Sequence, residues 1–441
     1  MDAAWLKYLP RPLRMIVSGR PQAQAIIGNS SWLVADKLLR MGIGLPIGVW
    51  MARYLGPALF GQLSYATAFV AMFGAIASAG LDGIVVRELL RQPASSKEIL
   101  GTAFFLKLIT GTAALLLSLA VVHATGSQDR TTFWLVAIIA AGLVFQAFDV
   151  IDFWFQSKVQ SRFVVCARMI AFLTSSIIRV MLILTHGSLF SFALVSLAEI
   201  AIATYCLVVA YKLRRQQVSE FQFRLGRARQ LLRESWPLLL AGVAVMLYMR
   251  IDMVMLQEMT DAHQVGIYAA ATKLSEVWYA VPIILSSSAF PAILRTHGSD
   301  PAAYLRGLRQ LYFLFAWLAI SISLPLSLGA DWLVTALYGS GYSAAGPVLA
   351  VHLWASVAVF LGVASSQHLL AENLQVISFY RTVIGLICNI LLNLVLIPHY
   401  QALGAAIATV AAYFIATFSL VFFRATRAQA THMLLAPFVR Y

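Results

Sequence analysis

The chain has 441 residues, of which 61% are hydrophobic and only 11% charged, and its mean hydropathy is +0.81. This is more apolar surface than a soluble core buries, so the composition excludes an ordinary soluble domain and predicts a polytopic helical membrane protein. The formal net charge of +14 would suit a nucleic-acid partner, unless the cations are placed by membrane topology. Cys166, Cys206 and Cys388 fall inside apolar segments without metal-ligand spacing and predict small buried hydrophobes.

The chain begins with a basic segment, residues 1–28, that lacks a continuous apolar region and a cleavage site. We expect it to lie uncleaved on the membrane surface. Twelve apolar segments long enough to cross a bilayer follow, at about 31–54, 62–86, 99–122, 132–156, 164–184, 189–211, 235–257, 264–290, 310–329, 345–365, 374–397 and 403–423. The predicted organisation is a six-helix lobe at 29–211, a basic linker at 212–234, a second six-helix lobe at 235–424 and a tail at 425–441.

The cations predict the orientation of these spans. Twenty-four Lys and Arg residues lie on the side that holds the N-terminus, whereas the opposite loops contribute only Arg130. Such an imbalance places both termini in the cytoplasm. Membrane topology thereby explains the net positive charge of the chain, and we expect no nucleic-acid partner.

The first span carries an unusual polar stripe. Its members, which share one face of a helix, are Asn29, Asp36, Lys37 and Arg40. Charges at membrane depth are costly, so this face is expected to border protein or a wet cavity rather than lipid. Just beyond the stripe, glycines at 42, 44 and 48 surround Pro46, and this composition predicts a break in the helix.

Two short stretches echo each other at a constant offset of 205 residues, namely 60–67 and 265–272. Each predicted half has an even number of spans, so a genuine repeat would relate the lobes by an axis along the membrane normal and leave a cleft between them. The alternative is chance similarity between helix starts that are rich in small residues.

Polar residues recur on one face of the fourth span, at Gln146, Asp149, Asp152 and Gln156. The two carboxylates there suit a coupling cation or proton, but they also fit an ion pair with Lys107 or a position at the membrane interface. In the eighth span, Lys273 and Glu276 are three residues apart and fit either an ion pair or a ligand site.

Three further sets of polar residues lie within spans. Arg250 and Asp252 are about 200° apart on a helix and cannot both face one cavity. Arg179 and Glu199, on adjacent spans, fit either each other or the cleft. Asn389 and Asn393 share a face and suggest helix packing, which leaves spans one to eight as the expected working surface.

No sequence motif indicates an enzyme. The chain contains no Walker A loop, HExxH, GxSxG or CxxC, and its non-cytoplasmic loops are too short for a catalytic domain. We therefore expect no catalytic residue, no metal site and no cofactor. Any transport would use an Na⁺ or H⁺ gradient or follow the gradient of the substrate.

Several motifs resemble one family. The run from Val49 to Gly61, the later segments 80–82 and 86–89, Asp152 to Gln156, 247–252 and 265–276 are similar to polysaccharide flippases of the Wzx type, in the multidrug/oligosaccharidyl-lipid/polysaccharide exporter superfamily. The resemblance covers roughly residues 29–413. It differs from the related lipid II flippases in lacking spans thirteen and fourteen, which speaks against a peptidoglycan precursor.

The resemblance implies a two-lobed exporter of the bacterial cytoplasmic membrane, which turns undecaprenyl-diphosphate-linked oligosaccharide to the outer leaflet by alternating access. A polysaccharide polymerase and a chain-length regulator are implied as partners. The competing hypotheses are a cation-coupled drug antiporter of the same superfamily and a non-transporting subunit of glycan assembly. Drug resistance on overexpression would favour the antiporter.

A diphosphate that crosses hydrocarbon needs fixed cations, and arginine suits bidentate contact with it. The candidate substrate-binding residues are Asn29, Lys37, Arg40, Arg53, Lys107, Arg179, Arg250 and Lys273. The candidate ion-coupling residues are Asp36, Asp82, Asp149, Asp152, Asp252 and Glu276. With Glu199 added, the span interiors hold seven acids against six cations, so the sequence does not predict a net-positive cavity.

Overall fold

The computed structural model describes residues 21–124, 130–297 and 299–436, and throughout these ranges the ordered elements are helices. The expected interfacial segment falls largely outside them. Ten of the described helical stretches are long and apolar enough to cross a membrane. Two of them, Ala35–Arg91 and Gln375–Phe422, contain a kink and are long enough to cross twice. The all-helical membrane fold is therefore confirmed for this part of the chain, and the lengths of these ten stretches are compatible with the twelve predicted spans.

The first half of the chain forms α2 (Pro21–Ser78), α3 (Asp82–Arg91), η2 (Pro93–Ser95), α4 (Ser96–Ala124), α5 (Arg130–Ala140), α6 (Gly142–Phe145), η3 (Gln146–Phe148), α7 (Asp149–Ser157), α8 (Ser161–Leu184) and α9 (Leu189–Leu213). The second half begins, after η4 (Val218–Glu220), with α10 (Leu225–Met259), α11 (Ala262–Glu276), η5 (Val277–Tyr279), α12 (Ala280–Leu294) and α13 (Pro301–Leu328). It ends with α14 (Ala330–Tyr338), η6 (Ser340–Tyr342), α15 (Ala345–His352), α16 (Ala355–Ala371), α17 (Gln375–Phe418), η7 (Ser419–Phe422) and α18 (Arg427–Leu435).

The break in α2 is not where the composition placed it. The helix keeps helical dihedral angles through Pro46, and the non-helical residue is Gly56, with φ 71° and ψ 169°. Glycine enters this left-handed region without a Cβ clash, and Pro57 then starts the next segment, where its missing N–H costs nothing. The prediction of a break at 42–48 was wrong. The kink at Gly56 falls instead between the first two predicted spans, 31–54 and 62–86.

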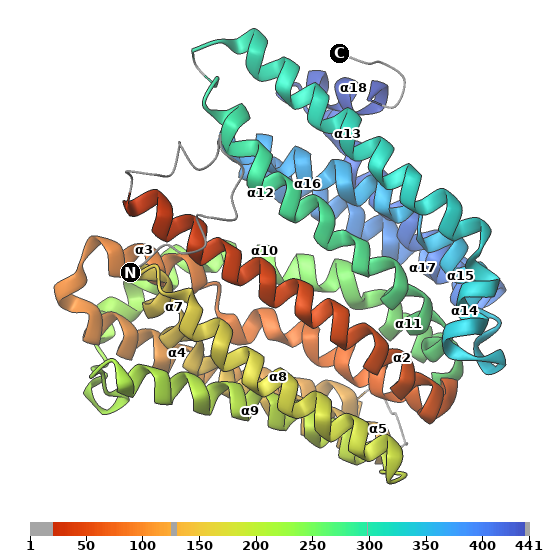
Figure 1. Cartoon of the computed structure of the whole chain (residues 1–441), viewed down its shortest axis with the longest axis horizontal. Coiled ribbons are helices and arrows are strands. Elements are labelled where there is room, and N and C mark those ends of the chain that lie inside the picture. The colour runs from red at the N-terminus through yellow and green to blue at the C-terminus, as the bar shows by residue number, and fades with distance from the viewer. Residues whose placement is uncertain (1–20, 125–129, 298, 437–441) are drawn as a thin grey trace.

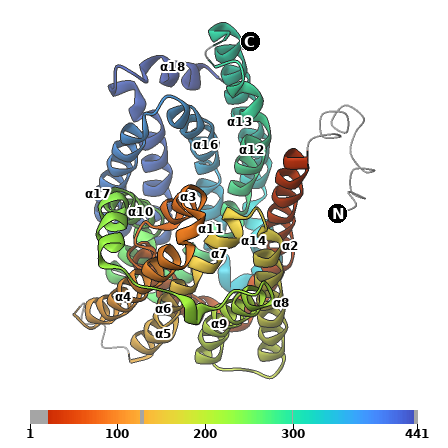
Figure 2. The same cartoon turned by 90° about the vertical axis from the view of Figure 1, so that its left-hand side faces the viewer.

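The two halves of the chain form two groups of helices, which lie in the lower and the upper part of the view in Figure 1. Helices α4 to α9 lie on one side, α12 to α18 lie on the other, and α2, α10 and α11 run between them; Figure 2 gives the view from one end. One hydrophobic cluster joins the halves, since residues of α2 such as Phe69 are clustered with Ile267 of α11 and Val348 of α15.

The cysteines are not buried as predicted. Cys166 is exposed, and Cys206 and Cys388 are partly exposed. In a membrane, an apolar segment is as stable facing lipid as facing protein, so hydrophobicity alone does not tell which face is inside.

Candidate functional site

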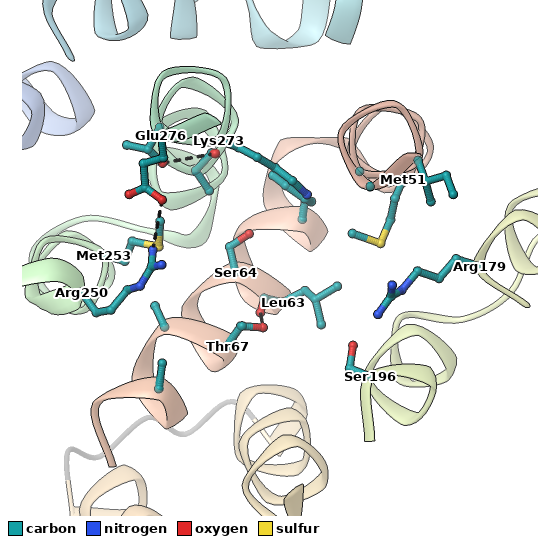
Figure 3. Close-up of a pocket in the computed structure, with 18 of the residues that line it drawn as sticks. Met51, Leu63, Ser64, Thr67, Arg179, Ser196, Arg250, Met253, Lys273 and Glu276 are labelled. Atoms are coloured by element: carbon teal, nitrogen blue, oxygen red, sulfur yellow. Dashed lines mark hydrogen bonds and ion pairs between the residues drawn. The ribbon is translucent and has the colours of Figure 1, made fainter. Parts of the chain in front are cut away.

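A cavity of about 420 Å³ lies between the two halves, at the crossing of α2 with α11. Figure 3 shows Arg179 and Ser196 of the first half on one side, and Arg250 and Glu276 of the second half opposite them. Other lining residues come from α2, α8, α10 and α11 and are small, hydroxylated or apolar: Gly44, Gly48, Met51, Phe60, Ser64, Thr67, Phe172, Ser176, Met253 and Thr272. We call this space the central cavity.

The walls of the central cavity repeat the offset of 205 seen in the sequence. On α2 the lining positions include 64, 67, 68 and 71, and on α11 they are 269, 272, 273 and 276. Each position of the first set thus has its equivalent in the second. The threonine is kept in both halves, whereas Lys273 and Glu276 stand where α2 has alanines. The repeat builds the cavity, and the second half adds these charges.

The charges that line the central cavity are Arg179, Arg250, Lys273 and Glu276, so cations outnumber acids by three to one. Six of the seven acids found within the spans do not line this cavity. Counting acids and cations over all the spans therefore did not predict the excess of cations here. The Nη1 of Arg250 lies 3.7 Å from Oε2 of Glu276. The predicted pair of Lys273 with Glu276 is wrong, because Glu276 faces Arg250.

Lys273 reaches across the cavity towards α2. Its Nζ lies 5.8 Å from the ring centroid of Phe60, and a Cβ placed on Gly48 would meet the end of the lysine side chain. The described residues offer Lys273 no ion pair. An unpaired ammonium group in a cavity within the membrane has a high desolvation cost. A bound anion would offset this cost.

A chain of ion pairs connects the polar stripe of the first span to the cavity. Arg40 Nε lies 2.9 Å from Asp36 Oδ1, as expected for residues four apart. Its Nη1 is 3.7 Å from Glu199 Oε1, and the other oxygen of Glu199 accepts from Arg179 at 2.9 Å and from Ser175 at 2.7 Å. Glu199 therefore sits between the stripe and the cavity, and Arg179 and Glu199 do face each other.

Two more acid clusters lie in the first half. Lys107, which is only 1% exposed, bridges Asp82 at 3.4 Å and Asp149 at 3.3 Å. Asp152 accepts from Arg168 at 2.7 Å and from Gln156 at 3.0 Å. The pair of Lys107 with an acid of the fourth span, one of the alternatives left open above, is thus present.

Asp252 differs from the other five candidate coupling acids, all of which face a cation. It is 3% exposed, and its donors are neutral: Asn393 Nδ2 at 2.7 Å, Thr409 Oγ1 at 2.7 Å and the Tyr268 hydroxyl at 3.1 Å. Asn389 accepts from Asn393 at 2.9 Å, while the Oδ1 of Asn393 is buried without a partner. The two amides, which spacing suggested were packing residues, belong to this cluster.

The predicted substrate-binding residues do not form one site. Arg179, Arg250 and Lys273 line the central cavity; Arg40 lines a smaller cavity of about 260 Å³ beside Asp149 and Glu199. Arg53 is exposed near the other end of the first segment of α2 and borders a groove with Ile183 and Leu337. Lys37 is partly exposed, Lys107 is held by its two acids, and the side chain of Asn29 lies outside the described residues.

The central cavity is closed at one end. Tyr342 donates a hydrogen bond to the backbone carbonyl of Ala52 at 2.8 Å, and its ring packs edge-on against Phe60 at 6.4 Å between centroids. Both contacts join the second half to α2 close to Gly56, which ends the first segment of α2. This is the end of that segment away from the N-terminus. The site is thus a polar cavity between two halves that meet at one end, which is the architecture of a membrane transporter.

Comparison with known proteins places this architecture. Residues 26–297 match the family model described as polysaccharide biosynthesis protein. The chain belongs to this family.

Solved structures share the fold. The lipid II flippase MurJ in an inward closed conformation superposes with a TM-score of 0.74 at 15% identity, covering 93% of this chain and 90% of that one. An inward-facing multidrug resistance transporter of the MATE family, from the MOP superfamily, gives a TM-score of 0.71 at 14% identity over 90% and 95% of the two chains. These structures confirm the fold that the sequence resemblance implied, and the family model confirms membership of the polysaccharide biosynthesis family.

Among curated proteins, the probable flippase AglR of Haloferax volcanii is 30% identical over 174 residues. The match takes in 37% of this chain and 35% of AglR, so it spans about a third of that relative.

Proposed function

We propose that this protein is a flippase that carries undecaprenyl-diphosphate-linked oligosaccharide from the cytoplasmic to the outer leaflet of the bacterial cytoplasmic membrane. The observation that carries the proposal is the cation excess of the central cavity, where no acid among the described residues pairs with Lys273. Family membership supports the polysaccharide substrate, and the name of AglR supports flipping.

The cavity offers each part of such a substrate a fitting partner. A diphosphate loses its hydration when it enters the membrane, and Lys273 and Arg179 replace that hydration with charge-assisted hydrogen bonds. The sugar hydroxyls would meet Ser64, Thr67 and Thr272. The polyprenyl chain remains in lipid, since the cavity lies between the lobes rather than inside one of them.

Alternating access follows from where the halves meet. With the termini in the cytoplasm, as the cation distribution predicts, the contact of Tyr342 with Ala52 closes the outer end. Outward opening requires that this contact separate while the halves close at the cytoplasmic end. A polysaccharide polymerase and a chain-length regulator would then take over the delivered glycan.

A coupling cation fits best at Asp252. A buried carboxylate with only neutral donors is costly unless it is protonated or holds a cation. The free Oδ1 of Asn393 and the Thr409 oxygen add ligands of the kind that Na⁺ takes in transporters. Na⁺ and H⁺ are therefore both chemically suited to this position.

The drug-antiporter hypothesis fits the cavity less well. A cationic drug would be repelled by Arg179, Arg250 and Lys273, against which Glu276 supplies a single negative charge already directed at Arg250. A non-transporting assembly subunit would have no use for these charges.

The test is a complementation assay that follows lipid-linked glycan in each leaflet. Lys273→Gln should reduce flipping by about tenfold or more, because a charge-assisted contact with the diphosphate is lost. Gly48→Val should act in the same way, because its side chain displaces that of Lys273.

The matched control is Gly42→Val, on the same helix but with nothing within 4 Å of the added carbon. All variants are compared at equal membrane abundance. Normal glycan export in both Lys273→Gln and Gly48→Val would remove Lys273 from the transport path. Depletion of the protein should make lipid-linked glycan accumulate in the inner leaflet. Depletion without that accumulation would favour the antiporter or the assembly subunit.

A further inference from the structure

A second cavity, of about 310 Å³, lies inside the second half of the chain and shares no lining residue with the central cavity. It is bordered by α10, η5, α16 and both segments of α17. Its polar wall carries Arg381, Ser366 and Thr382, and its aromatic wall consists of Tyr248, Tyr279 and Tyr413. The remaining wall is aliphatic and is formed by Val245, Met249, Ala358, Val359, Gly362, Val363 and Ala416.

Arg381 is the charged residue of this cavity. Its guanidinium group donates to Ser366 Oγ at 2.9 Å and to Ser365 Oγ at 3.3 Å. Ser365 in turn accepts from Gln429 at 3.1 Å, so neutral groups hold the arginine in place. No carboxylate of the described residues pairs with it. A guanidinium ion that is fixed in position, partly buried and unpaired has the properties of an anion-binding group.

The cavity has a second polar group without a partner. The hydroxyl of Tyr279 is buried and makes no hydrogen bond. Such an orphan donor inside a protein is costly, and a ligand oxygen would satisfy it. A bound molecule would therefore meet one positive charge and one hydroxyl donor, next to an apolar wall.

The cavity reaches the surface of the molecule beside Val245. Val245 is 37% exposed, whereas Ala358 and Tyr413 at the back of the cavity are buried. The exposed Val245 lies on α10, a helix long and apolar enough to cross a membrane.

The depth of Arg381 matches a lipid headgroup. Arg381 follows the start of α17 at Gln375 by six residues, which is about 9 Å along a helix, and Ser366 lies similarly close to the end of α16 at Ala371. Both helix ends lie at the end of the molecule where α2 begins. The charge is thus near one membrane surface, and the aliphatic wall continues from it.

We propose that this cavity binds the phosphate headgroup of an anionic phospholipid of the surrounding bilayer, with the phosphate at Arg381 and the first carbons of the acyl chains against Val359 and Val363. The site is independent of the flippase substrate, which occupies the central cavity. Bound lipid would brace α10 against α16 and α17, whose close packing depends on small residues: a Cβ on Gly385 would lie 2.9 Å from the Tyr248 ring.

The experiment measures lipid retained by the purified full-length protein, using native mass spectrometry, together with thermal stability in detergent. Added phosphatidylglycerol should bind the wild type and raise its Tm, and phosphatidylcholine should do so much less. Arg381→Gln should weaken phosphatidylglycerol binding by about tenfold or more, since a charge-assisted contact is lost. Arg381→Lys should keep part of the binding, because the charge remains without the fork geometry.

Two further variants separate the site from general effects. Arg306→Gln removes an exposed cation from the same half and should bind phosphatidylglycerol as the wild type does. Val363→Phe fills the cavity while leaving Arg381 and its serines in place, and it should lose the lipid.

Equal retention of phosphatidylglycerol in Arg381→Gln, Val363→Phe and wild type would overturn the proposal. Inorganic phosphate and sn-glycerol 3-phosphate serve as headgroup-only probes. If they stabilise the protein as strongly as phosphatidylglycerol does, the site belongs to a soluble phosphate and the lipid assignment is wrong.

Discussion

Gly61 and Gly266 occupy equivalent positions in the two halves, and each lies against the backbone of the helix that carries the other. A Cβ on Gly61 would collide with the carbonyl oxygen of Ala262, and a Cβ on Gly266 would collide with that of Pro57. Pro57 and Ala262 are themselves 205 residues apart, so the contact is reciprocal in the sense of a two-fold axis. The weak sequence echo thus marks the point where the halves touch.

This contact predicts that both glycines are needed for the closed arrangement. Gly61→Ala or Gly266→Ala should each destabilise it by roughly 1–3 kcal/mol, because the backbone atoms they would meet cannot rotate away. Gly42→Ala on the same helix, where nothing lies within 4 Å, should be neutral or slightly stabilising. Thermal unfolding of the purified variants measures the difference, and a normal Tm in both interface variants would contradict the close contact.

The orientation of the chain is a separate prediction. In a cysteine-free background, a cysteine at Ser343, exposed between α14 and α15, should react with an impermeant thiol reagent added to intact cells. A cysteine at Ser219, exposed in the basic linker, should react only after the membrane is opened. Labelling of position 219 from outside would reverse the assigned topology.

Much of the fold was accessible from the sequence, because length and hydropathy determine which segments cross a membrane. The sequence pattern around Pro46 predicted a break that the structure does not have, because the helix tolerates this proline. A glycine with positive φ that is followed by a proline, as at Gly56, does end a helical segment. The site was harder to predict. Spacing finds partners within one helix, such as Asp36 and Arg40, but says nothing of contacts between helices.

Contacts between helices decide the roles of the remaining charges. Glu276 faces Arg250 rather than its neighbour Lys273, and this leaves Lys273 in the central cavity without a carboxylate partner among the described residues. Asn393 and Thr409 come from spans with almost no charge, so their convergence on Asp252 is a product of the fold. The spacing of Asn389 and Asn393 was the available signal, and a search for a buried acid facing it would have found Asp252.

The ion-coupling proposal predicts a specific effect at Asp252. Asp252→Asn keeps the shape of the side chain but cannot hold a cation, so transport should fall and lose its dependence on the ion gradient. If Na⁺ is the ion, it should raise the Tm of the wild type more than K⁺ does, and this difference should vanish in the variant. If H⁺ is the ion, transport should respond to the pH gradient in the wild type alone.

The control for this prediction is Asp149→Asn, which leaves Lys107 its contact with Asp82 at 3.4 Å. It should lower stability without changing the gradient dependence, since Asp149 acts there as an ion-pair partner. Gradient dependence that persists in Asp252→Asn and disappears in Asp149→Asn would move the coupling site to the first half.

The last prediction concerns Glu199, which pairs with both Arg179 and Arg40. Under the proposed function Glu199 would compete with the diphosphate for Arg179, so Glu199→Gln should bind a polyprenyl diphosphate roughly two- to tenfold more tightly while turnover falls through slower release. Arg179→Gln should weaken binding. The double variant should bind no more tightly than Arg179→Gln, because Glu199 acts through that arginine. A merely structural Glu199 would lower stability in Glu199→Gln without tightening the binding. The same geometry predicts that exchanging Asp36 and Arg40 will not restore function, because an acid at position 40 would face Glu199 and like charges repel there.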